Sequence, residues 1–546
     1  MLSVRSLAAL SLVALALGGL ASAATIRGTD RADVLRGTAG PDVLDGRGGN
    51  DAIIGLAGRD LVSGGAGRDL LDGGRGSDRL VALFDRAADT VRCGPGLDLV
   101  NAGLEDRVLA DCELVARQLS RDTTASREAQ HETEAEPDSF AWGSTVVTVF
   151  QVGRIGGGGA AAIGFASSPD GGRTWRSGLL PGITAETTPA GPHARASDPV
   201  VAYDAAHGVW LAVTLAIAGD AFRLLVSRSR DGVVWEMPVT AAEGAPGSLD
   251  KEWIVCDTWP QSRFRGRCYL SYLDDGPRQI VTRWSADGGL AWSAPVPTSP
   301  TAPRGLDVNG AQPAVQPDGT LVVVYTDFAH PPSDFASEVV AVRSTDGGAS
   351  FSPPVTVSRL ALAPIPAVRA FALPSVEVDG SGRVVAAWQS CLPIEQCQAS
   401  RILFSSSQDG LAWSPPRAVA PAGASEQFLP GLGADPRSGG DTGRLSLVYH
   451  ALPRDCLSSP SCPGIDVFYV SSLDGGRSWS SPRRLSAQSM PLSWIARTTS
   501  GLMLGDYVSV SYAGGRAVAT FVLAGEPVAG ALRQAVVAAV LPRETG

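Results

Sequence analysis

The sequence contains a single lysine, Lys251, among 45 basic residues, and its formal net charge is −10. We attribute the excess of arginine to a GC-rich coding bias. Proteins that bind nucleic acid need a basic face, so this charge argues against a nucleic-acid partner. Charged residues make up only 18% of the chain and hydrophobic residues 44%, which excludes a largely disordered protein. A chain of 546 residues is expected to hold two or three domains.

Long hydrophobic runs are missing beyond the N-terminus. Residues 7–20 are apolar, Arg5 precedes them, and the small residues Ala21-Ser22-Ala23 follow. This order predicts a secretory signal peptide over 1–23, because the run is shorter than the roughly 20 residues of a membrane-spanning helix. An uncleaved anchor is the alternative. We therefore expect a secreted, extracellular protein without stable membrane insertion.

The motifs of several enzyme and metal-site classes are also missing. No G-x-S-x-G surrounds a nucleophilic serine and no phosphate-binding loop occurs, so neither Ser-His-Asp catalysis nor nucleotide binding is supported. No C-x-x-C occurs, and no histidine lies at ligand spacing from a cysteine, which disfavours zinc. The eight cysteines instead form local pairs that are typical of disulfides in an exported chain: Cys93/Cys112, Cys256/Cys268, Cys391/Cys397 and Cys456/Cys462.

Aspartate recurs every nine residues between residues 28 and 81. The members of this series are Asp33, Asp42, Asp51, Asp60, Asp69 and Asp78. A glycine lies five residues before each aspartate, and an aliphatic residue lies two residues after it. A strict short period indicates stacked repeats. The segment resembles RTX, or hemolysin-type, repeats, which implies a parallel β-roll that binds Ca²⁺.

The residue types explain the chemistry that the resemblance implies. Glycine permits a tight turn, the aliphatic residue stacks inside the roll, and each aspartate faces the aspartate two copies later. Carboxylate and carbonyl oxygens suit Ca²⁺, so the six aspartates are the expected metal ligands. A metal-free solenoid is the alternative. Arg31 replaces the second glycine of the first copy, which makes the first site doubtful.

Two segments follow the repeats. Residues 89–112 continue the pattern in degenerate form and are expected to cap the roll, which gives a calcium-binding domain over 24–117 with one disulfide in its cap. Residues 118–138 hold many charged residues and almost no large apolar side chains. This composition predicts an acidic, flexible linker.

A second motif recurs from residue 139 to the end of the chain. Its first copy is Ser168-Pro-Asp170-Gly-Gly172-Arg-Thr174-Trp175. The aspartates of the six copies are Asp170, Asp231, Asp287, Asp346, Asp409 and Asp474. The motif resembles the BNR, or Asp-box, repeats of the sialidase superfamily, which implies a β-propeller over 139–546. Its aspartate is expected to accept N–H bonds within its own turn, a structural role.

The strand-like runs between the boxes set the size of the propeller. Each unit of about 60 residues shows three runs before the box and one after it, which is the pattern of a four-stranded blade. We favour seven blades, with the N-terminal end of the module lending a closing strand, and six blades is the alternative. The predicted fold is therefore all-β, an RTX-type parallel β-roll joined to a β-propeller.

Ligand-binding residues are expected in the loops of one propeller face, near the axis. The candidates for this face are Arg154, Asp198, Asp250, Glu252, Trp253 and Asp506. The sialidase resemblance further implies an arginine clamp for a carboxylate and a tyrosine–glutamate nucleophile pair. Candidates for these groups are Arg195, Arg304, Arg369 and Arg497 for the clamp, and Tyr507 with Glu377 for the pair.

The sialidase resemblance is incomplete at one motif. The family's Arg-Ile-Pro, which supplies the first arginine, is missing, and Arg154-Ile155-Gly156 is the nearest string. Solvated loop arginines and a tyrosine at the edge of the core are therefore the alternatives. Three arginines near the axis, within reach of a tyrosine and a carboxylate, would favour an enzyme. Arginines scattered around the rim would favour binding.

Together these patterns predict a secreted calcium-binding protein whose sialidase-like propeller recognises an extracellular glycan or a surface protein. The alternative is an exo-sialidase-like glycoside hydrolase that acts on sialylated or related acidic glycans. The sequence leaves the question of enzymatic activity open.

Overall fold

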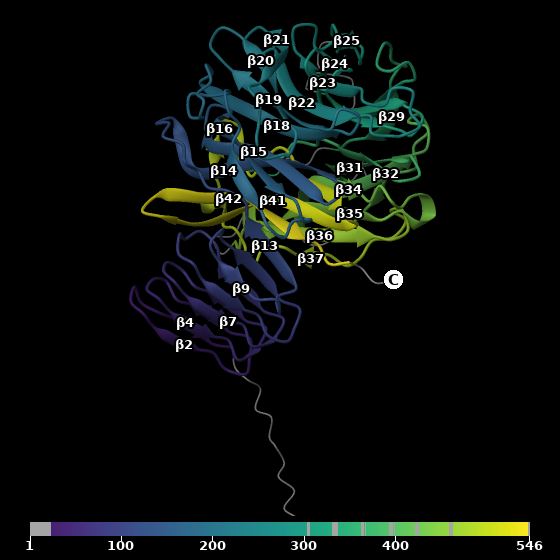
Figure 1. Cartoon of the computed structure of the whole chain (residues 1–546). Helices are drawn as coiled ribbons and strands as arrows, with labels where there is room; N and C mark the ends of the chain where they lie inside the picture. Colours follow the sequence, from purple (N-terminus) through teal and green to yellow (C-terminus); the bar gives the residue numbers. More distant parts are fainter. Residues whose placement is uncertain are drawn as a thin grey trace, which may run out of the picture.

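A computed structural model describes most of the chain. The described residues are 23–302, 306–329, 337–361, 365, 367–392, 397, 399–420, 425–457 and 462–543. The predicted signal peptide up to residue 22 and the candidate Arg304 lie outside them. In Figure 1 the N-terminal module is a roll of short strands below a larger array of antiparallel sheets. The fold is all-β, with short 3-10 helices at Gly440–Thr442, Arg454–Leu457 and Leu492–Trp494. No helix in the described part is long and apolar enough to cross a membrane.

The roll has two parallel sheets because successive nine-residue copies place their strands on alternate sides. One sheet contains β1 (Thr25–Arg27), β3 (Val43–Asp45), β6 (Leu61–Ser63), β9 (Arg79–Ala82), β11 (Leu99–Ala102) and β13 (Leu114–Gln118). The other contains β2 (Val34–Arg36), β4 (Ala52–Ile54), β7 (Leu70–Asp72), β10 (Thr90–Arg92) and β12 (Arg107–Val108). The turns add the parallel pair β5 (Ala57–Gly58) and β8 (Arg75–Gly76).

The aliphatic residue of each copy forms the core of the roll. Leu44, Ile53, Val62, Leu71 and Leu80 have no exposed surface and pack in one cluster. The predicted parallel β-roll with an aliphatic stack is therefore confirmed.

The larger module is built from successive antiparallel groups of four strands. In chain order they are β14 (Ala129–Trp142), β15 (Thr145–Ile155), β16 (Ala160–Ser168) and β17 (Arg176–Leu179); β18 (Arg195–Asp204), β19 (Val209–Ile217), β20 (Phe222–Ser229) and β21 (Val239–Gly244); β22 (Leu249–Cys256), β23 (Cys268–Asp274), β24 (Gln279–Ser285) and β25 (Val296–Pro297); β26 (Leu306–Val315), β27 (Leu321–Ala329), β28 (Glu338–Ser344) and β29 (Val355–Arg359); β30 (Ser375–Val378), β31 (Val384–Ser390), β32 (Arg401–Ser407) and β33 (Arg417–Ala418); and β34 (Ser425–Ala434), β35 (Leu445–Pro453), β36 (Asp466–Ser472) and β37 (Arg483–Arg484).

The last strands of the chain continue this array. A short hairpin, β38 (Arg497–Thr498) and β39 (Gly501–Leu502), precedes β40 (Ser509–Ala513), β41 (Arg516–Val528) and β42 (Ala531–Val540). The outer edge of β42 pairs antiparallel with β13 of the roll, with Ala116 opposite Ala539. The roll thus supplies the fourth strand beside β40–β42.

The first strand of each group faces a common axis. Residues of β14, β18, β22, β26, β30, β34 and β40 line one cavity of about 160 Å³. The hydrophobic clusters lie between neighbouring groups, and each includes the box aromatic of a group, such as Trp235, Trp292, Phe351 or Trp479. This is the arrangement of a β-propeller.

The roll and the propeller share one core. A single cluster combines Leu83, Leu99 and Leu114 of the roll with residues of β35, β36, β41 and β42. Asn101 adds polar contacts, because its side chain donates to the carbonyl oxygen of Leu485 at 3.0 Å and accepts from the Ala487 N–H at 2.6 Å. The two modules are therefore joined by packing and by a shared sheet.

The prediction of a flexible linker at 118–138 is wrong. Residues 129–142 form β14, the innermost strand of the first group, and Glu134, Glu136 and Asp138 are buried. Glu134 accepts bonds from the Ser120 hydroxyl at 2.6 Å and the Val536 N–H at 2.9 Å. These three carboxylates point inward, where each has a polar partner, whereas Glu128 of the same segment is exposed.

All four cysteine pairs of the sequence form disulfides. Cys93–Cys112 staples the end of the roll, and Cys256–Cys268 joins β22 to β23. Cys391–Cys397 and Cys456–Cys462 follow β31 and β35 and tie the loops after those strands.

Candidate metal sites and ligand cleft

The aspartates of the roll form a hydrogen-bonded ladder. Oδ1 of each aspartate accepts the main-chain N–H of the aspartate two copies earlier at 2.8 Å, in the pairs Asp51/Asp33, Asp60/Asp42, Asp69/Asp51 and Asp78/Asp60. This is the predicted facing of copies n and n+2. The ladder continues through Asp89/Asp69, Asp98/Asp78, Asp106/Asp89 and Glu113/Asp98. The nine-residue period could not identify Asp89, Asp106 or Glu113, because their spacings from their partners are 20, 17 and 15 residues.

The second carboxylate oxygen divides the ladder into two parts. Oδ2 is buried without a hydrogen-bond partner in Asp51, Asp60, Asp69, Asp78, Asp89 and Asp98. In the first two copies this oxygen is bonded: Asp33 Oδ2 accepts from the Thr29 N–H at 2.7 Å, and Asp42 Oδ2 accepts from the Thr38 N–H at 2.5 Å. The structure therefore separates Asp33 and Asp42 from the four predicted ligands that follow.

The residue after the first glycine of each copy explains this difference. In copies three to six it has a positive φ, at Arg47 (67°), Leu56 (78°), Gly65 (92°) and Gly74 (95°). The threonines of the first two copies do not adopt this conformation, and their N–H and hydroxyl groups point at the aspartate of their own turn. A left-handed residue at this place thus leaves the carboxylate oxygen free.

Glycine brings a carbonyl oxygen close to the free Oδ2 of Asp51 and of Asp60. A Cβ added to Gly46 would lie 2.4 Å from the Gly64 carbonyl oxygen and 2.5 Å from Asp51 Oδ2, and a Cβ added to Gly55 would meet Gly73 and Asp60 in the same way. A buried, unpartnered carboxylate oxygen beside a carbonyl oxygen is the hard-oxygen environment that Ca²⁺ prefers. These turns therefore fit Ca²⁺.

Without a cation these carboxyl groups are hard to ionise. Burial raises the pKa of Asp69 to about 6, of Asp78 to about 7 and of Asp89 to about 8, and neighbouring aspartates add to each rise. A bound cation would remove both causes, because it compensates the desolvated charge and separates the like charges.

On the propeller, bulges in the innermost strands turn side chains toward the axis. Glu136 in β14, Asp198 in β18 and Lys251 in β22 have φ values of 53°, 48° and 50°. Each lies where the pairing register of its strand shifts. Gly310 and Leu429 occupy the same place in β26 and β34, with φ values of 68° and 57°. One repeated backbone irregularity therefore presents three charged residues on one side of the axis.

Lys251 is the centre of a buried charge network. Its Nζ contacts the carboxylates of Asp198, Asp506 at 2.7 Å and Glu136 at 3.5 Å. Arg369 donates to both carboxylate oxygens of Asp506, from Nε to Oδ1 at 2.7 Å and from Nη2 to Oδ2 at 2.5 Å. Burial acts to lower the pKa of Lys251, but the surrounding carboxylates outweigh it and raise that pKa. Lys251 is therefore a permanent cation and cannot act as a general base near neutral pH.

An open cleft of about 640 Å³ lies beside this network. Its charged lining residues are Arg154, Arg195, Arg369, Lys251, Glu136, Asp198, Asp250 and Asp275. Gly157, Gly158 and Gly159 also line it and add no side chains of their own. Three of the arginines that the sequence singled out thus meet in one cleft, although Arg154 was assigned only to the general ligand face.

Arg154 and Arg195 differ from the other cations of the cleft. Arg154 donates to the carbonyl oxygen of Gly159, and Arg195 Nη1 donates to that of Gly158 at 3.3 Å. Within the described residues neither has a carboxylate within ion-pair distance. Two guanidinium groups that line one cleft and form no ion pair are suited to an anion.

The remaining candidates lie outside the cleft or have other partners. Arg497 is exposed and does not line the cleft. Trp253 packs edge-on against Tyr507, with ring centroids 5.2 Å apart. Glu252 is buried, and neither of its carboxylate oxygens has a hydrogen-bond partner.

The expected pairing of Tyr507 with Glu377 is not supported. The Tyr507 hydroxyl donates to the carbonyl oxygen of Pro199 at 3.0 Å. Glu377 lines the axial cavity, where burial, and then Asp138, raise its pKa to about 8. Tyr507 does not line the cleft that contains the arginines and instead lines a separate, smaller cavity.

The Asp-box aspartates have the predicted structural role. Asp170 Oδ1 accepts the N–H groups of Arg173 and Thr174 at 3.1 and 2.9 Å, and Trp175 donates to Gly172 at 3.1 Å.

Comparison with protein families identifies both modules. Residues 27–62 and 48–80 match the RTX calcium-binding nonapeptide repeat, and residues 116–364 match the BNR repeat-like domain. The chain therefore carries RTX repeats joined to a BNR-repeat-like domain, as the sequence predicted, and RTX repeats imply calcium binding. A search of curated proteins finds no match.

Several solved structures resemble the chain at low identity. An α-L-arabinofuranosidase from Fusarium graminearum is 16% identical, with a TM-score of 0.40 over 62% of this chain and 92% of its own. An ulvan lyase of polysaccharide lyase family 25 is 11% identical, with a TM-score of 0.47 over 77% of this chain and 95% of its own. An α-L-arabinanase from Penicillium chrysogenum is 12% identical, with a TM-score of 0.41 over 78% of this chain and 98% of its own.

Proposed function

We propose that the chain is a secreted, Ca²⁺-binding protein whose propeller recognises an anionic group of an extracellular glycan in the cleft beside Lys251. In this proposal residues 1–23 are removed on export and the roll of 24–117 is ordered by Ca²⁺. The propeller has seven blades, and β13 completes the last of them. The four disulfides support an oxidising compartment.

The observation that carries the proposal is the pair of unneutralised guanidinium groups in the cleft. Lys251 and Arg369 are held by carboxylates, but Arg154 and Arg195 are bonded only to neutral acceptors. A carboxylate or sulfate on a sugar could accept bidentate bonds from such a group. The three glycines that line the cleft add no side chains of their own beside the sugar ring.

Binding is favoured over sialidase-type hydrolysis because no tyrosine is among the described residues that line the cleft. The only tyrosine candidate, Tyr507, is bonded to Pro199 beneath the charge network. A glycoside hydrolase with two carboxylates remains the second candidate, since Glu136 and Asp198 both line the cleft and burial raises the pKa of Glu136 in the direction that a general acid needs.

The test is calorimetric binding of sialylated, uronate-containing and sulfated oligosaccharides, each compared with its neutral counterpart. We expect an anionic glycan to bind, and Arg195→Ala to weaken binding about tenfold to a hundredfold, the loss of one charged hydrogen bond. Arg497→Ala is the matched control, because Arg497 is exposed outside the cleft, and should leave the affinity unchanged. Equal affinity for charged and neutral glycans would refute anion recognition. Turnover of a fluorogenic glycoside that is lost in Glu136→Gln would favour the hydrolase.

A further inference from the structure

An irregular turn of the roll contains a carboxylate cluster that the nonapeptide pattern does not include. The segment between β9 and β10 has no glycine, and Phe84 stands five residues before Asp89, where the repeats have glycine. Phe84 has a φ of 77°, a conformation that is costly for a residue with a side chain. Some tertiary contact must therefore hold this turn.

The propeller provides that contact. A Cβ added to Gly525 of β41 would lie 2.4 Å from the Phe84 ring, so the ring sits directly on the backbone of this strand. Arg86 reaches Glu132 of β14 with an ion pair of 2.9 Å. The turn that contains Phe84, Asp85 and Arg86 is thus a docking contact between the two modules.

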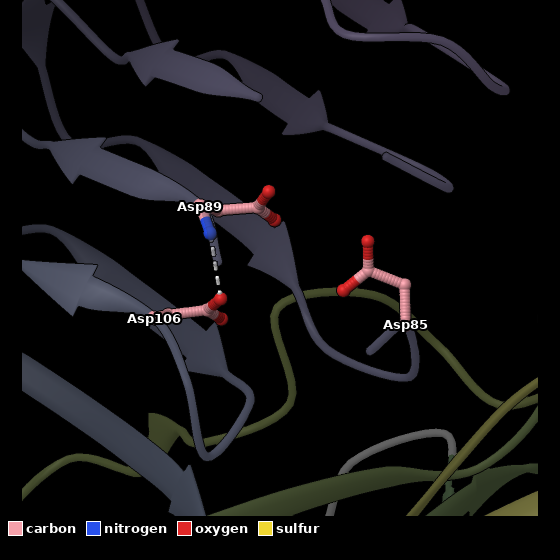
Figure 2. A group of neighbouring side chains, drawn as sticks. All are labelled: Asp85, Asp89 and Asp106. Atoms are coloured by element: carbon pink, nitrogen blue, oxygen red, sulfur yellow. Dashed lines mark hydrogen bonds between the residues drawn. The ribbon is translucent and has the colours of Figure 1, made fainter. Parts of the chain in front are cut away.

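Asp85 reaches back from this turn toward the ladder. Figure 2 shows its carboxylate directed at those of Asp89 and Asp106. Each of the three residues offers an oxygen within 4.8 Å of the others. Asp106 accepts from the Asp89 N–H at 3.0 Å and the Gly103 N–H at 2.6 Å, and Asp85 Oδ2 accepts from the Gly67 N–H at 3.0 Å. These bonds fix the three carboxyl groups in place.

One oxygen of the cluster has no partner at all. Asp89 is 1% exposed, and its Oδ2 is buried without a hydrogen-bond partner. The arginines nearby do not neutralise it: Arg117 donates to the carbonyl oxygens of Gly103 and Asp106, and Arg121 pairs with Glu105. A buried anionic oxygen that faces two further carboxylates points to a cation.

We propose that Asp85, Asp89 and Asp106 form a divalent-cation site, with Ca²⁺ as the fitting ion, that fixes the docking turn of the roll against the propeller. The site is separate from the turns of the nonapeptide repeats, because Asp85 comes from the irregular segment. It does not depend on what the cleft binds. A cation bound at this site would stabilise the contact between the roll and the propeller, whereas cations bound at the repeat sites would order only the roll.

The experiment counts bound calcium on the full-length mature protein by equilibrium dialysis and emission spectroscopy. Asp85→Asn should lose one Ca²⁺ per chain relative to the wild type while the other bound ions remain. Arg86→Ala is the control, because it removes the neighbouring ion pair but keeps all three carboxylates, and its count should equal that of the wild type. If Asp85→Asn lacks the β-signal of the folded protein, Asp106→Asn is measured in its place.

Three results would overturn the proposal. Equal calcium counts in the wild type and the folded carboxylate variant would show that these groups hold no ion. Loss of an ion in Arg86→Ala as well would show that the shape of the turn, and not Asp85, governs the count. A wild type that binds no Ca²⁺ would remove both this site and the repeat sites, whereas equal counts in a wild type that does bind Ca²⁺ and in the variant would remove this site alone.

Discussion

Both modules repeat an aspartate in a glycine-containing turn, yet the two sets of aspartates have opposite surroundings. In the box, Asp474 accepts bonds from the Ser478 N–H at 2.9 Å and from the hydroxyls of Ser478 and Ser472 at 2.6 and 2.8 Å. In the roll, Asp78 Oδ1 accepts one N–H and its Oδ2 has no partner. The box supplies hydrogen bonds to both oxygens of its own carboxylate. The roll leaves one oxygen of its aspartate without a hydrogen-bond partner.

The pKa values express the same contrast. Burial acts to raise the pKa of Asp474, but the hydrogen bonds from Ser478 and Ser472 outweigh it and lower the pKa to about 2. Burial raises the pKa of Asp78 to about 7, with Asp60 and Asp98 adding to the rise. A repeated aspartate is thus a structural group when its own turn supplies the donors, and it is suited to bind a cation when its turn supplies none.

Calcium removal should give the largest effect that separates the modules. At a free Ca²⁺ concentration a hundredfold above Kd, each occupied site stabilises the folded state by about 2.7 kcal/mol. We expect a chelator to lower the unfolding temperature of the roll by far more than that of the propeller. Calorimetry of the whole chain with and without Ca²⁺ measures both transitions. If the unfolding temperature of the roll is the same with and without Ca²⁺, calcium does not stabilise the roll.

A pair of matched substitutions should give the next largest effect. Asp78→Asn removes a ligand, so in Ca²⁺ it should cost about 2.7 kcal/mol, while in chelator it should stabilise the roll, because a desolvated charge is gone. Asp474→Asn weakens hydrogen bonds within a turn and should cost about 1 kcal/mol with or without Ca²⁺. Denaturant unfolding in the two buffers measures each value. An Asp78→Asn effect of the same sign in both buffers would contradict the comparison.

The sequence predicted the repeats well because their physics is local. A nine-residue period indicates stacked turns and the box indicates a hairpin, and the resemblance to RTX and BNR repeats then implied the roll and the propeller. The end of the ladder was missed because Asp106 and Glu113 follow no period. The acidic segment that contains Glu134 and Glu136 was taken for a linker, since composition cannot tell a solvated carboxylate from one paired in the interior.

The cleft was only partly predictable for a different reason. Arg154 lies near the end of β15, Arg195 begins β18 and Arg369 precedes β30, so the three come from separate groups, and only the closed array brings them together. The bulges that aim Asp198 and Lys251 at the axis have no common residue type, so no motif reveals them. Arg497 was an equally good candidate by position in the sequence, and the fold alone separates it from Arg195.

The pH dependence without calcium should be smaller and should have a defined sign. Because the folded pKa of Asp78 is raised from 3.8 to about 7, the folded state binds more protons than the unfolded state between these values. Stability should therefore fall as pH rises from 5 to 8 in chelator. The lowered pKa of Asp474 gives the opposite sign, with stability lost only as pH falls below about 4 toward 2.

A control isolates the contribution of the roll to this slope. Glu134 in β14 has a pKa that burial raises to about 8, so the propeller contributes a slope of the same sign. Asp78→Asn should reduce the slope by at most about 1.4 kcal/mol per pH unit, the share of one proton. Unfolding in chelator at several pH values measures the difference. An unchanged slope would show that Asp78 is ionised throughout.

The smallest expected effect tests the comparison within the roll itself. Thr38 donates its N–H to Asp42 Oδ2, whereas the corresponding residues of copies three to six have a positive φ and leave that oxygen free. Thr38→Gly allows the left-handed conformation and should add one Ca²⁺ to the count. Thr38→Ser keeps the hydroxyl donor and a side chain that disfavours the left-handed conformation, so it should leave the count unchanged. If Thr38→Gly adds no ion, a free carboxylate oxygen beside a carbonyl oxygen is not sufficient to make a site, because a Cβ added to Gly37 would already lie 2.5 Å from the Gly55 carbonyl oxygen and 2.6 Å from Asp42 Oδ2.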